Sequence, residues 1–585
     1  MRVLRDRACA GALCLLALAG AGGDRPAIGS VVGELRFTDI RWLPRTLRDF
    51  GERRAYVLVA TSVDCPLVQR YLPRLSALER EYRAQQVQFV AVNVAPGDSV
   101  LEMATQAVEH DADFPFVKDF DGSVVAELGF ERTPEVVVLD AQRRLRYRGR
   151  IDDQYRLGGV RPAATRNDLR AALDDVLAGR EVASAETPVD GCAIGGAPAP
   201  AGTPNYAEHV DPILRSHCLE CHRPGGAAPF ALGTYAQALK LSDMIAEVVE
   251  QQRMPPWYAS RKHGPFVNER GLSPAERDTV LAWAASGAAP GDLSALPPLP
   301  DPPPSRWEIA EPDLVLRSPI EAQIPADGYV PYQYVVLPHV FAEDTWVEGV
   351  QVLAENPRVL HHANLGWVRL GEDFNEVKNF ITGEVPGGDA MALDPGTACL
   401  LPKGSALALE VHYVTTGKPE RDRISVGLRF PRVPVQRRLR NHQVADLRFR
   451  IPPGAPAHPV TAERVFEQDA VGLGLFVHMH LRGKDMTFRA HYPDGRGETL
   501  LLVPSYSFDW QQSYRWAPGA RRFPRGTRIE CLAHFDNSAF NPYNPDPGAT
   551  VRFGLQTDQE MMYGFVFYVH EHEQLGIAVD PRTGQ

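Results

Sequence analysis

The chain has few long hydrophobic runs, little surplus charge and few cysteines. Beyond its N-terminus, no segment of the 585 residues is long and apolar enough to cross a bilayer, which takes about twenty such residues. The formal net charge of −11 is modest for this length, so we expect neither nucleic acid nor an anionic membrane as a partner. Eight cysteines are present, and two of them fall within an N-terminal leader.

The N-terminus has the pattern of an export signal. Three arginines among the first seven residues precede an apolar stretch over 8–19, and Ala19-Gly20-Ala21 fits a small-residue cleavage site. The stretch is about a dozen residues long, which is short for a membrane anchor. We therefore expect a signal peptide over 1–21 and an exported protein, periplasmic or extracellular. Export also suits haem c, disulfides and copper, which the reducing cytosol disfavours.

Composition breaks predict a multidomain chain. Its length suggests roughly three to four domains. An Ala, Gly and Pro-rich stretch over 181–204 and a proline-rich stretch over 291–305 are expected linkers. The predicted domains are an α/β domain over 28–180, a small helical domain over 205–290, and an all-β pair of sandwiches over 306–437 and 438–575.

Local periodicity predicts the main elements of each domain. In the first domain we expect strands at 56–60 and 87–93, a helix over 66–85, a hairpin pair at 135–139 and 145–151, and a closing helix over 167–177. In the second we expect a helix over 239–252 and another that begins at Ser273. In the third, 407–413, 474–480 and 564–569 alternate as strands do.

The sequence Cys218-Leu219-Glu220-Cys221-His222 is typical of a c-type haem attachment site. Two thiols attach the haem, and the adjacent histidine is placed as an axial ligand. Met254, which precedes two prolines, is the expected second axial ligand, with Met244 as the alternative. The block 205–290 resembles a small class I cytochrome c domain, which implies one haem c per chain.

Soft metal ligands are scattered through the last 230 residues. Histidine nitrogen and methionine sulfur are copper ligands, and a thioether favours Cu(I). Residues i and i+2 of a strand share a face, so His478 and His480 can reach one ion while Met479 points away. Adjacent residues cannot share a strand face, so His361 and His362 can chelate together only at a bend or bulge. The candidate ligands are His361, His362, His412, His478, His480 and Met561, with Met562 as an alternative to Met561.

This ordered set resembles the type II copper monooxygenases, the family of the peptidylglycine and dopamine β-monooxygenases, over about 320–572. The resemblance implies two coppers per chain: one on the histidine pair and His412, which stores an electron, and one on His478, His480 and Met561. The second copper would bind O2 and substrate and hydroxylate a C–H bond. His478, His480 and Met561 are therefore the expected catalytic group.

The sequence departs from the family at the substrate. The peptide-processing members have an arginine two residues before the first histidine of the HxH motif, where this chain has Phe476, and their Asn and Tyr after the methionine correspond here to Tyr563 and Phe565. Without that carboxylate clamp, we expect an apolar small organic substrate in place of a peptide. The turn-rich segment 536–545 either lines the site or joins strands, and Cys399 and Cys531 either pair or do not.

Cys65 lies between an apolar strand and a helix, where a helix N-terminus lowers a thiol pKa. Pro134 precedes another strand, where thioredoxin-like folds place a cis-proline. The block 28–180 resembles a thioredoxin-like redoxin. It departs from the CxxC and CxxxC patterns, because position 68 is Val and position 69 is Gln. Cys192 is the remote candidate partner, and a link to Cys65 is structural, regulatory or catalytic.

These features predict an exported copper monooxygenase that hydroxylates a small organic molecule with O2. Electrons would pass through the fused haem c, whose linker raises its local concentration, and would come from ascorbate or a redox protein. Two alternatives remain: a non-catalytic electron-transfer or copper-handling protein, and a thiol-disulfide oxidoreductase with accessory domains. The missing cysteine at position 68 counts against the last.

Overall fold

The computed structural model describes residues 25–585 apart from 157–158, 196–202, 225, 227, 229, 300–305, 329, 370, 373, 375–378 and 386–387. The expected signal peptide lies outside this part of the chain. Within it, no helix combines the length and the apolar character needed to span a bilayer.

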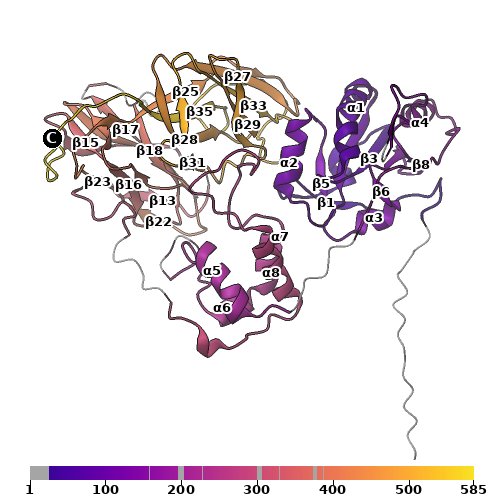
Figure 1. Cartoon of the computed structure of the whole chain (residues 1–585), viewed down its shortest axis with the longest axis horizontal. Helices are drawn as coiled ribbons and strands as arrows, with labels where there is room; N and C mark the ends of the chain where they lie inside the picture. The colour runs from indigo at the N-terminus through magenta and orange to yellow at the C-terminus, as the bar shows by residue number, and fades with distance from the viewer. Residues whose placement is uncertain are drawn as a thin grey trace, which may run out of the picture.

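The N-terminal domain is built on one seven-stranded sheet in the order β2-β1-β5-β4-β3-β7-β8 (Figure 1). Strands β3, β4 and β5 are parallel, and β7 and β8 form the predicted antiparallel hairpin. The strands are β1 (Arg36–Asp39), β2 (Pro44–Thr46), β3 (Ala55–Thr61), β4 (Val87–Asn93), β5 (Phe116–Lys118), β7 (Val136–Asp140) and β8 (Leu145–Gly149).

Helices cover both faces of this sheet, because its central strands are apolar on both sides. Val57 and Val59 of β3 pack with helices α1 (Pro66–Tyr82), α2 (Val100–Glu109) and α4 (Asp168–Leu177). Leu58, between them, faces the opposite core with α3 (Ser123–Leu128). The predicted thioredoxin-like α/β domain is confirmed.

A small helical unit follows, organised around the buried ring of Trp283. It contains α5 (Asp211–His217), α6 (Tyr235–Lys240), α7 (Ser242–Glu250) and α8 (Pro274–Ala285), after a short π-helical turn at Tyr206–Val210. Helix α8 begins as predicted, with Ser273 and Glu276 forming a capping box. The single helix expected over 239–252 is wrong: α6 starts earlier, at the cap Thr234, and the chain bends at Leu241 before α7.

Between α7 and α8 the chain leaves the helical unit. Trp257, Tyr258 and Phe266 pack into the core of the last β domain. The Ser260 N–H donates to the carbonyl of Leu502 at 2.8 Å. The helical unit is therefore tied to the β region by its own chain as well as by the linker that follows it.

The first β region packs short sheets around a core that includes Val350, Leu365 and Val426. Its main sheets have the orders β12-β23-β16-β19 and β14-β21-β17-β18. The strands are β12 (Leu314–Arg317), β13 (Ala322–Ile324), β14 (Gln333–Val340), β15 (Thr345–Val347), β16 (Gly349–Ala354), β17 (Leu360–Arg369), β18 (Phe380–Glu384), β19 (Met391–Ala392), β20 (Thr397–Leu401), β21 (Ser405–Tyr413), β22 (Glu420–Asp422) and β23 (Ile424–Arg429).

The second β region packs the sheet β25-β35-β28-β31 against β27-β33-β29-β30. Strand β24 (Arg437–Arg438) leads into it from the first region, by pairing with β20. The strands are β25 (Arg440–Ala445), β26 (Arg450–Ile451), β27 (His458–Val465), β28 (Ala470–Met479), β29 (Gly483–His491), β30 (Gly497–Val503), β31 (Ser513–Arg515), β32 (Arg521–Phe523), β33 (Arg528–Phe535), β34 (Val551–Arg552) and β35 (Met562–His570).

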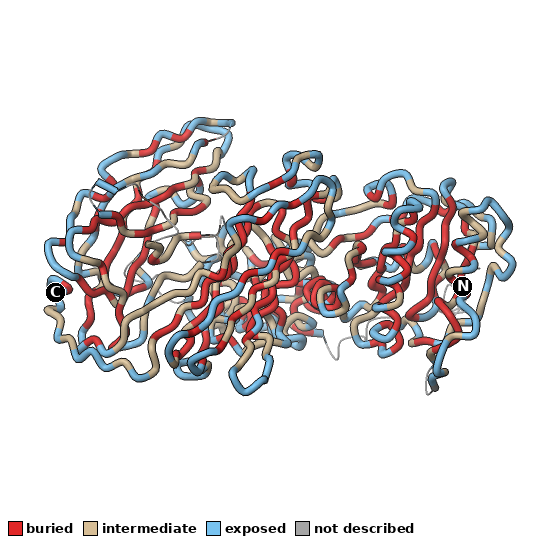
Figure 2. The backbone as a smooth tube through the Cα atoms, turned by 90° about the horizontal axis from the view of Figure 1, so that it is seen from above, coloured by how far each residue is buried: buried red, intermediate tan, exposed pale blue. Residues whose placement is uncertain are grey.

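The C-terminal tail returns to the first β region, where the N–H of Trp346 donates to the carbonyl of Gly584. Buried backbone gathers in the N-terminal sheet and in the β sheets, as Figure 2 shows. The all-β character expected for the last block is confirmed.

Candidate metal and thiol sites

A β-bulge brings three histidines together. Strand β17 pairs with β21, and the register shifts between Leu360 and His362, so that His361 is the extra residue. His362 lies opposite His412 on the partner strand. One ring nitrogen from each of the three histidines lies within 4.8 Å of the others, and the Nδ1 atoms of His361 and His362 are 3.1 Å apart. The adjacent residues His361 and His362 could approach one ion only at a bend or bulge, and the structure has a bulge at this position.

The chemistry of this group fits a metal ion. Burial, reinforced by the neighbouring histidines, lowers the pKa of His412 to about 3 and that of His362 well below its ordinary value. Burial therefore favours the neutral imidazole at His362 and His412, the state in which histidine ligates metals. The Nδ1 atom of His412 is buried without a hydrogen-bond partner. A lone pair left in this way among two other imidazoles matches a soft or borderline cation.

The second group lies at the end of β28 and the start of β35. His478 and His480 line a pocket together with Met561, while Met479 is fully buried in the core behind them. Their rings are 5.2 Å apart. Met562, the alternative ligand, is likewise fully buried in that core. Strand alternation therefore separates the candidate ligands from their neighbours as expected.

Outer partners orient both imidazoles of this group. The Nδ1 atom of His478 lies 2.8 Å from the amide oxygen of Gln511, and that of His480 lies 3.2 Å from the carbonyl oxygen of Gln559. With Nδ1–H donating in each ring, Nε2 remains available as the ligand atom. Periodicity could not single out Gln511, because it lies in a loop outside any strand or helix.

A buried carboxylate fixes the backbone around these ligands. Glu560 accepts N–H bonds from His480 at 2.9 Å, Arg482 at 2.7 Å and Met561 at 3.2 Å. Burial is the largest influence on this carboxyl and raises its pKa to about 7. One side chain thus ties the end of the HxH strand to the methionine.

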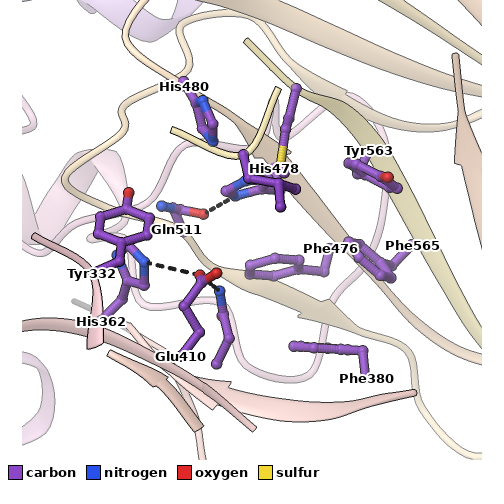
Figure 3. A pocket seen from close by; sticks show the side chains of 13 residues that line it. Tyr332, His362, Phe380, Glu410, Phe476, His478, His480, Gln511, Tyr563 and Phe565 are labelled. Carbon is purple, nitrogen blue, oxygen red and sulfur yellow. Dashed lines mark hydrogen bonds and ion pairs between the residues drawn. The ribbon is translucent and has the colours of Figure 1, made fainter. Parts of the chain in front are cut away.

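The two groups border one small pocket of about 50 Å³, as Figure 3 shows. His362 faces it from the first β region, and His478 and His480 face it from the second. Glu410 lies between them, with an oxygen 3.9 Å from Nε2 of His362. The site is therefore a junction of the two β regions.

One loop touches both groups. The ring of Phe508 stacks on His361 at 5.2 Å and meets His480 edge-on at 5.9 Å. Next to it, the Asp509 carboxylate lies 3.5 Å from Nε2 of His361. The sequence did not single out this loop, because only tertiary packing shows what it contacts.

Aromatic rings form the rest of the pocket wall. Phe565 stacks with Tyr563 at 5.7 Å and lies 5.9 Å from Phe476 and 5.3 Å from Phe380. These rings give the pocket an apolar end.

The turn-rich segment 536–545 does not line this pocket but braces it from behind. Asn537 accepts a hydrogen bond from Nε of Arg482 at 3.0 Å, and Asn541 donates to the carbonyl of Leu481 at 3.1 Å. The segment therefore supports the chain directly after His480.

The predicted haem motif forms a turn directly after α5. The His222 N–H donates to the carbonyl of Cys218, and the His222 Nδ1 lies 3.1 Å from the carbonyl of Phe230. That contact leaves Nε2 free as an iron ligand, and both thiols of the motif are unpaired. The residues thus fit a haem. Met254 lies four residues beyond the end of α7 at Glu250, and the alternative, Met244, is 51% exposed.

The two remote cysteines of the N-terminal domain meet. Cys65 is the residue before α1, and Cys192 lies on the short strand β11 (Cys192–Ala193), opposite Thr133 of β6 (Arg132–Thr133). Their sulfur atoms are 2.9 Å apart. The peptide bond between Thr133 and Pro134 is cis, as expected.

The pair is polarised. Burial raises the pKa of the Cys65 thiol, but hydrogen bonds from Cys192, Thr133 and the first backbone N–H groups of α1 outweigh it, so the pKa is lowered. Burial and the neighbouring sulfur raise the pKa of Cys192 to about 11. Cys65 is therefore the better nucleophile and Cys192 its proton-bearing neighbour. Val68, at the usual partner position, is fully buried in the core.

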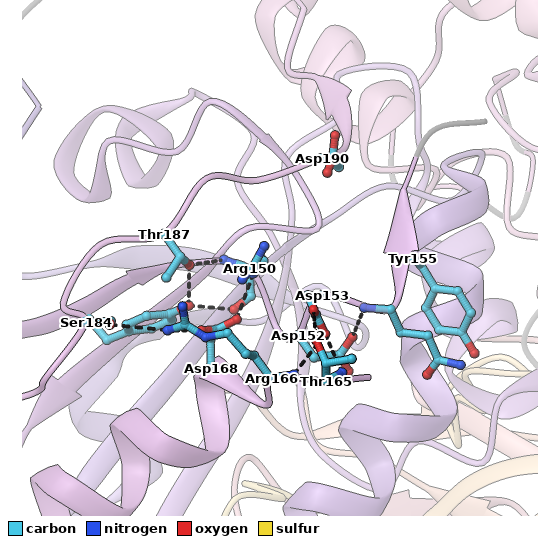
Figure 4. Close-up of polar contacts among 12 residues, drawn as sticks. Arg150, Asp152, Asp153, Tyr155, Thr165, Arg166, Asp168, Ser184, Thr187 and Asp190 are labelled. Atoms are coloured by element: carbon cyan, nitrogen blue, oxygen red, sulfur yellow. Dashed lines mark hydrogen bonds and ion pairs between the residues drawn. The ribbon is translucent and has the colours of Figure 1, made fainter. Parts of the chain in front are cut away.

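A polar network positions the segment that delivers Cys192 (Figure 4). The Thr187 hydroxyl lies 2.6 Å from that of Tyr147 and accepts the N–H of Arg150 at 3.1 Å. Arg150 in turn pairs with Asp168 at 2.7 Å. Beside the cysteine, a Cβ on Gly191 would lie 2.3 Å from the carbonyl oxygen of Thr133, so glycine permits the close approach.

Cys399 and Cys531 are not paired with each other. Both are free thiols: Cys399 packs on the core of the first β region, and Cys531 is fully buried in that of the second.

The comparisons with known proteins bear on the N-terminal domain. Residues 44–163 match the model of the Redoxin family. A search of curated proteins found no match. A hypothetical protein of Sinorhizobium meliloti is similar at 29% identity over 29% of this chain and 95% of its own, with a TM-score of 0.28.

Two further solved structures are similar over 30% and 25% of the chain. An uncharacterised conserved protein of Geobacillus kaustophilus has 28% identity over 30% of this chain and 94% of its own, with a TM-score of 0.28. A secreted disulfide oxidoreductase of Mycobacterium tuberculosis has 19% identity over 25% and 95%, with a TM-score of 0.19. The family match over 44–163 agrees with the thioredoxin-like fold of the N-terminal domain.

Proposed function

We propose that the β regions form an exported copper monooxygenase that hydroxylates a C–H bond of a small organic molecule. The observation that carries the proposal is the bulge at His361, which draws three imidazoles together and leaves the Nδ1 atom of His412 buried without a hydrogen-bond partner. A buried ring nitrogen without a hydrogen-bond partner costs free energy, so this arrangement favours a metal site over a purely structural cluster of histidines.

In this proposal His361, His362 and His412 hold one copper, and His478, His480 and Met561 hold the other. Copper would supply O2 binding and electron storage. One oxygen atom enters the C–H bond and the other leaves as water, with two electrons and two protons from an external reductant. Gln511 and the Gln559 carbonyl hold the imidazoles, and the aromatic wall positions the substrate and excludes water.

The fused motif at Cys218, Cys221 and His222, with Met254 as the other axial ligand, would hold the haem c that relays these electrons. Histidine and methionine ligation raises the haem potential, which suits electron transfer.

The test is a substrate screen with isotopically labelled O2. Copper-loaded protein is reduced without oxygen, then mixed with labelled O2 and a panel of apolar and peptide compounds. We expect labelled hydroxyl in an apolar product and its loss in Met561→Ala. A protein that only relays electrons would reoxidise without labelling any product, and Met561→Ala would leave its reoxidation unchanged.

The Redoxin match and the close approach of the Cys65 and Cys192 sulfur atoms support a second function, thiol-disulfide exchange. The comparisons favour this function over the copper monooxygenase. We propose thiol-disulfide exchange at Cys65. Its thiolate would attack a substrate disulfide and release one thiol, and Cys192 would then displace the second thiol and close a Cys65–Cys192 disulfide. The sulfurs need to move only about 1 Å to bond. An external dithiol would reduce the pair again.

Trapping separates these steps. With Cys192→Ser, a mixed disulfide on Cys65 should accumulate and be visible by mass spectrometry, whereas Cys65→Ser should form none. A disulfide map of oxidised protein that lacks the Cys65–Cys192 link would contradict this second function.

A further inference from the structure

A second and larger hollow adjoins the histidine pocket between the two β regions. Its volume is about 190 Å³, and it shares Asn364, Phe380 and Phe476 with the smaller pocket. Figure 3 shows Phe476 and Phe380 at the end of the small pocket away from His480. The two hollows therefore adjoin through an aromatic boundary.

The larger hollow is apolar inside and charged only at its edge. Both β regions and the chain between them contribute apolar residues to its lining: Val385, Met391, Leu439, Leu473 and Phe567. Among the described lining residues the charged ones are Asp389, Asp394 and Arg515. Asp389 is paired with Arg270 at 2.6 Å, and the other two are exposed to solvent.

We propose that this hollow, the apolar chamber, binds the hydrocarbon body of the substrate and directs one of its C–H bonds toward His478, His480 and Met561. The inference rests on the proposed monooxygenase function and deepens it. The substrate class is a neutral molecule with a body the size of a benzene ring carrying a short alkyl chain.

Volume sets that size. A dry cavity of about 150 Å³ lined by aliphatic and aromatic side chains binds benzene, so about 190 Å³ leaves room for a ring and a few further carbon atoms. The histidine pocket, at about 50 Å³, has room only for the reacting end. A longer or doubly ringed body would extend beyond the chamber toward its solvent-exposed edge at Asp394 and Arg515.

Charge sets the class. A carboxylate or ammonium placed in the chamber would lose its hydration, and the one carboxylate that does not face solvent, Asp389, is already neutralised by Arg270. We therefore expect neutral compounds to bind and their charged analogues to be rejected.

The chamber is tested by calorimetric titration of the full-length, metal-free protein with benzene, toluene, ethylbenzene and n-propylbenzene. Affinity should rise about fourfold with each added carbon, as expected for burial of one methylene. Phenylpropanoate and phenylpropylammonium should bind at least about tenfold more weakly than propylbenzene.

Two variants fill the chamber from different walls, so that a folding defect in one leaves the other informative. Leu473→Trp and Leu439→Trp should each weaken propylbenzene binding at least about tenfold. Leu447→Trp makes the same change at a side chain that is 52% exposed and not in the lining, and should leave affinity within about twofold.

The inference is overturned if no alkylbenzene binds, if both filling variants bind as the parent does, or if the charged analogues bind equally well. Because the titration uses metal-free protein, it is independent of oxygen chemistry. Propylbenzene binding without any later hydroxylation would support the chamber and contradict the monooxygenase. Hydroxylation of a small molecule without alkylbenzene binding would support the monooxygenase and contradict the chamber.

Discussion

At the scale of single residues, outer contacts orient several of the candidate histidine ligands. Asp509 approaches His361, Glu410 approaches His362 and Gln511 accepts from His478. Outer contacts of this kind fix the tautomer and the direction of the lone pair. They come from segments far away in sequence, so spacing and the family resemblance could name the candidate ligands but not these partners.

Removing one outer partner should weaken one copper alone. Gln511→Leu leaves the His478 ring without its acceptor, and we expect copper affinity of that group to fall by about 10- to 100-fold, measured by competition with a copper chelator. The matched control is Gln512→Leu, because the Gln512 amide donates to the Pro256 carbonyl instead. Equal losses in both variants would show a general effect of the loop.

The Cys65 thiol should ionise below its ordinary pKa of 9.0, because hydrogen bonds to its sulfur outweigh burial. The thiolate is present above the pKa and is lost as pH falls through it. The ultraviolet thiolate absorbance of reduced protein, minus that of Cys65→Ser, should therefore titrate with a midpoint below pH 9.0. Cys399→Ser serves as the control variant. A midpoint at or above 9.0 would contradict the polarised pair.

At the scale of elements, sequence periodicity predicted strands and faces well. The alternation around His478 separates ligand from core, and the adjacent histidines required a bulge that the structure contains. The helix over 239–252 failed because α6 is already capped at Thr234 and the backbone leaves the helical conformation at Leu241, although the apolar pattern continues across it. Periodicity indicates which face of a helix is apolar, but it does not indicate where one helix ends and the next begins.

Glu560 should be a stabilising element of the last β region. Glu560→Ala leaves three buried N–H groups without an acceptor, and we expect the free energy of unfolding to fall by about 3 kcal/mol or more. Denaturant titration measures the change. Glu463→Ala, at an exposed glutamate of β27, should cost less than about 0.5 kcal/mol. Similar losses of stability in the two variants would contradict a stabilising role of the Glu560 hydrogen bonds.

At the scale of the whole molecule, the N-terminal domain packs against the turn-rich segment 536–545, which lies behind the histidine pocket. Phe540 stacks with Phe50 at 5.2 Å, and the Arg45 guanidinium lies 4.1 Å from its ring centre. Trp42 meets Tyr258 edge-on at 5.6 Å. Composition predicted linkers between the domains. It could not predict the packing of the N-terminal domain on Phe540, nor that Trp257 and Phe266 pack into the second β region, because these contacts depend on surfaces that form only after folding.

Phe540→Ala should loosen this docking. The loss of a stacked ring and a cation–π contact is worth about 1–2 kcal/mol, enough to shift the domain toward undocked arrangements, and we expect a larger radius of gyration by X-ray scattering. Tyr543→Ala, on the same segment and 49% exposed, should leave the radius unchanged. An unchanged radius in Phe540→Ala would show that other contacts hold the domain.

Copper content tests the central claim most directly. Protein loaded with copper and dialysed should retain about two copper ions per chain, and His412→Ala and Met561→Ala should each reduce the retained copper to about one, at different sites by electron paramagnetic resonance. Retention of less than about one ion by the parent protein, or of the full amount by both variants, would contradict the account.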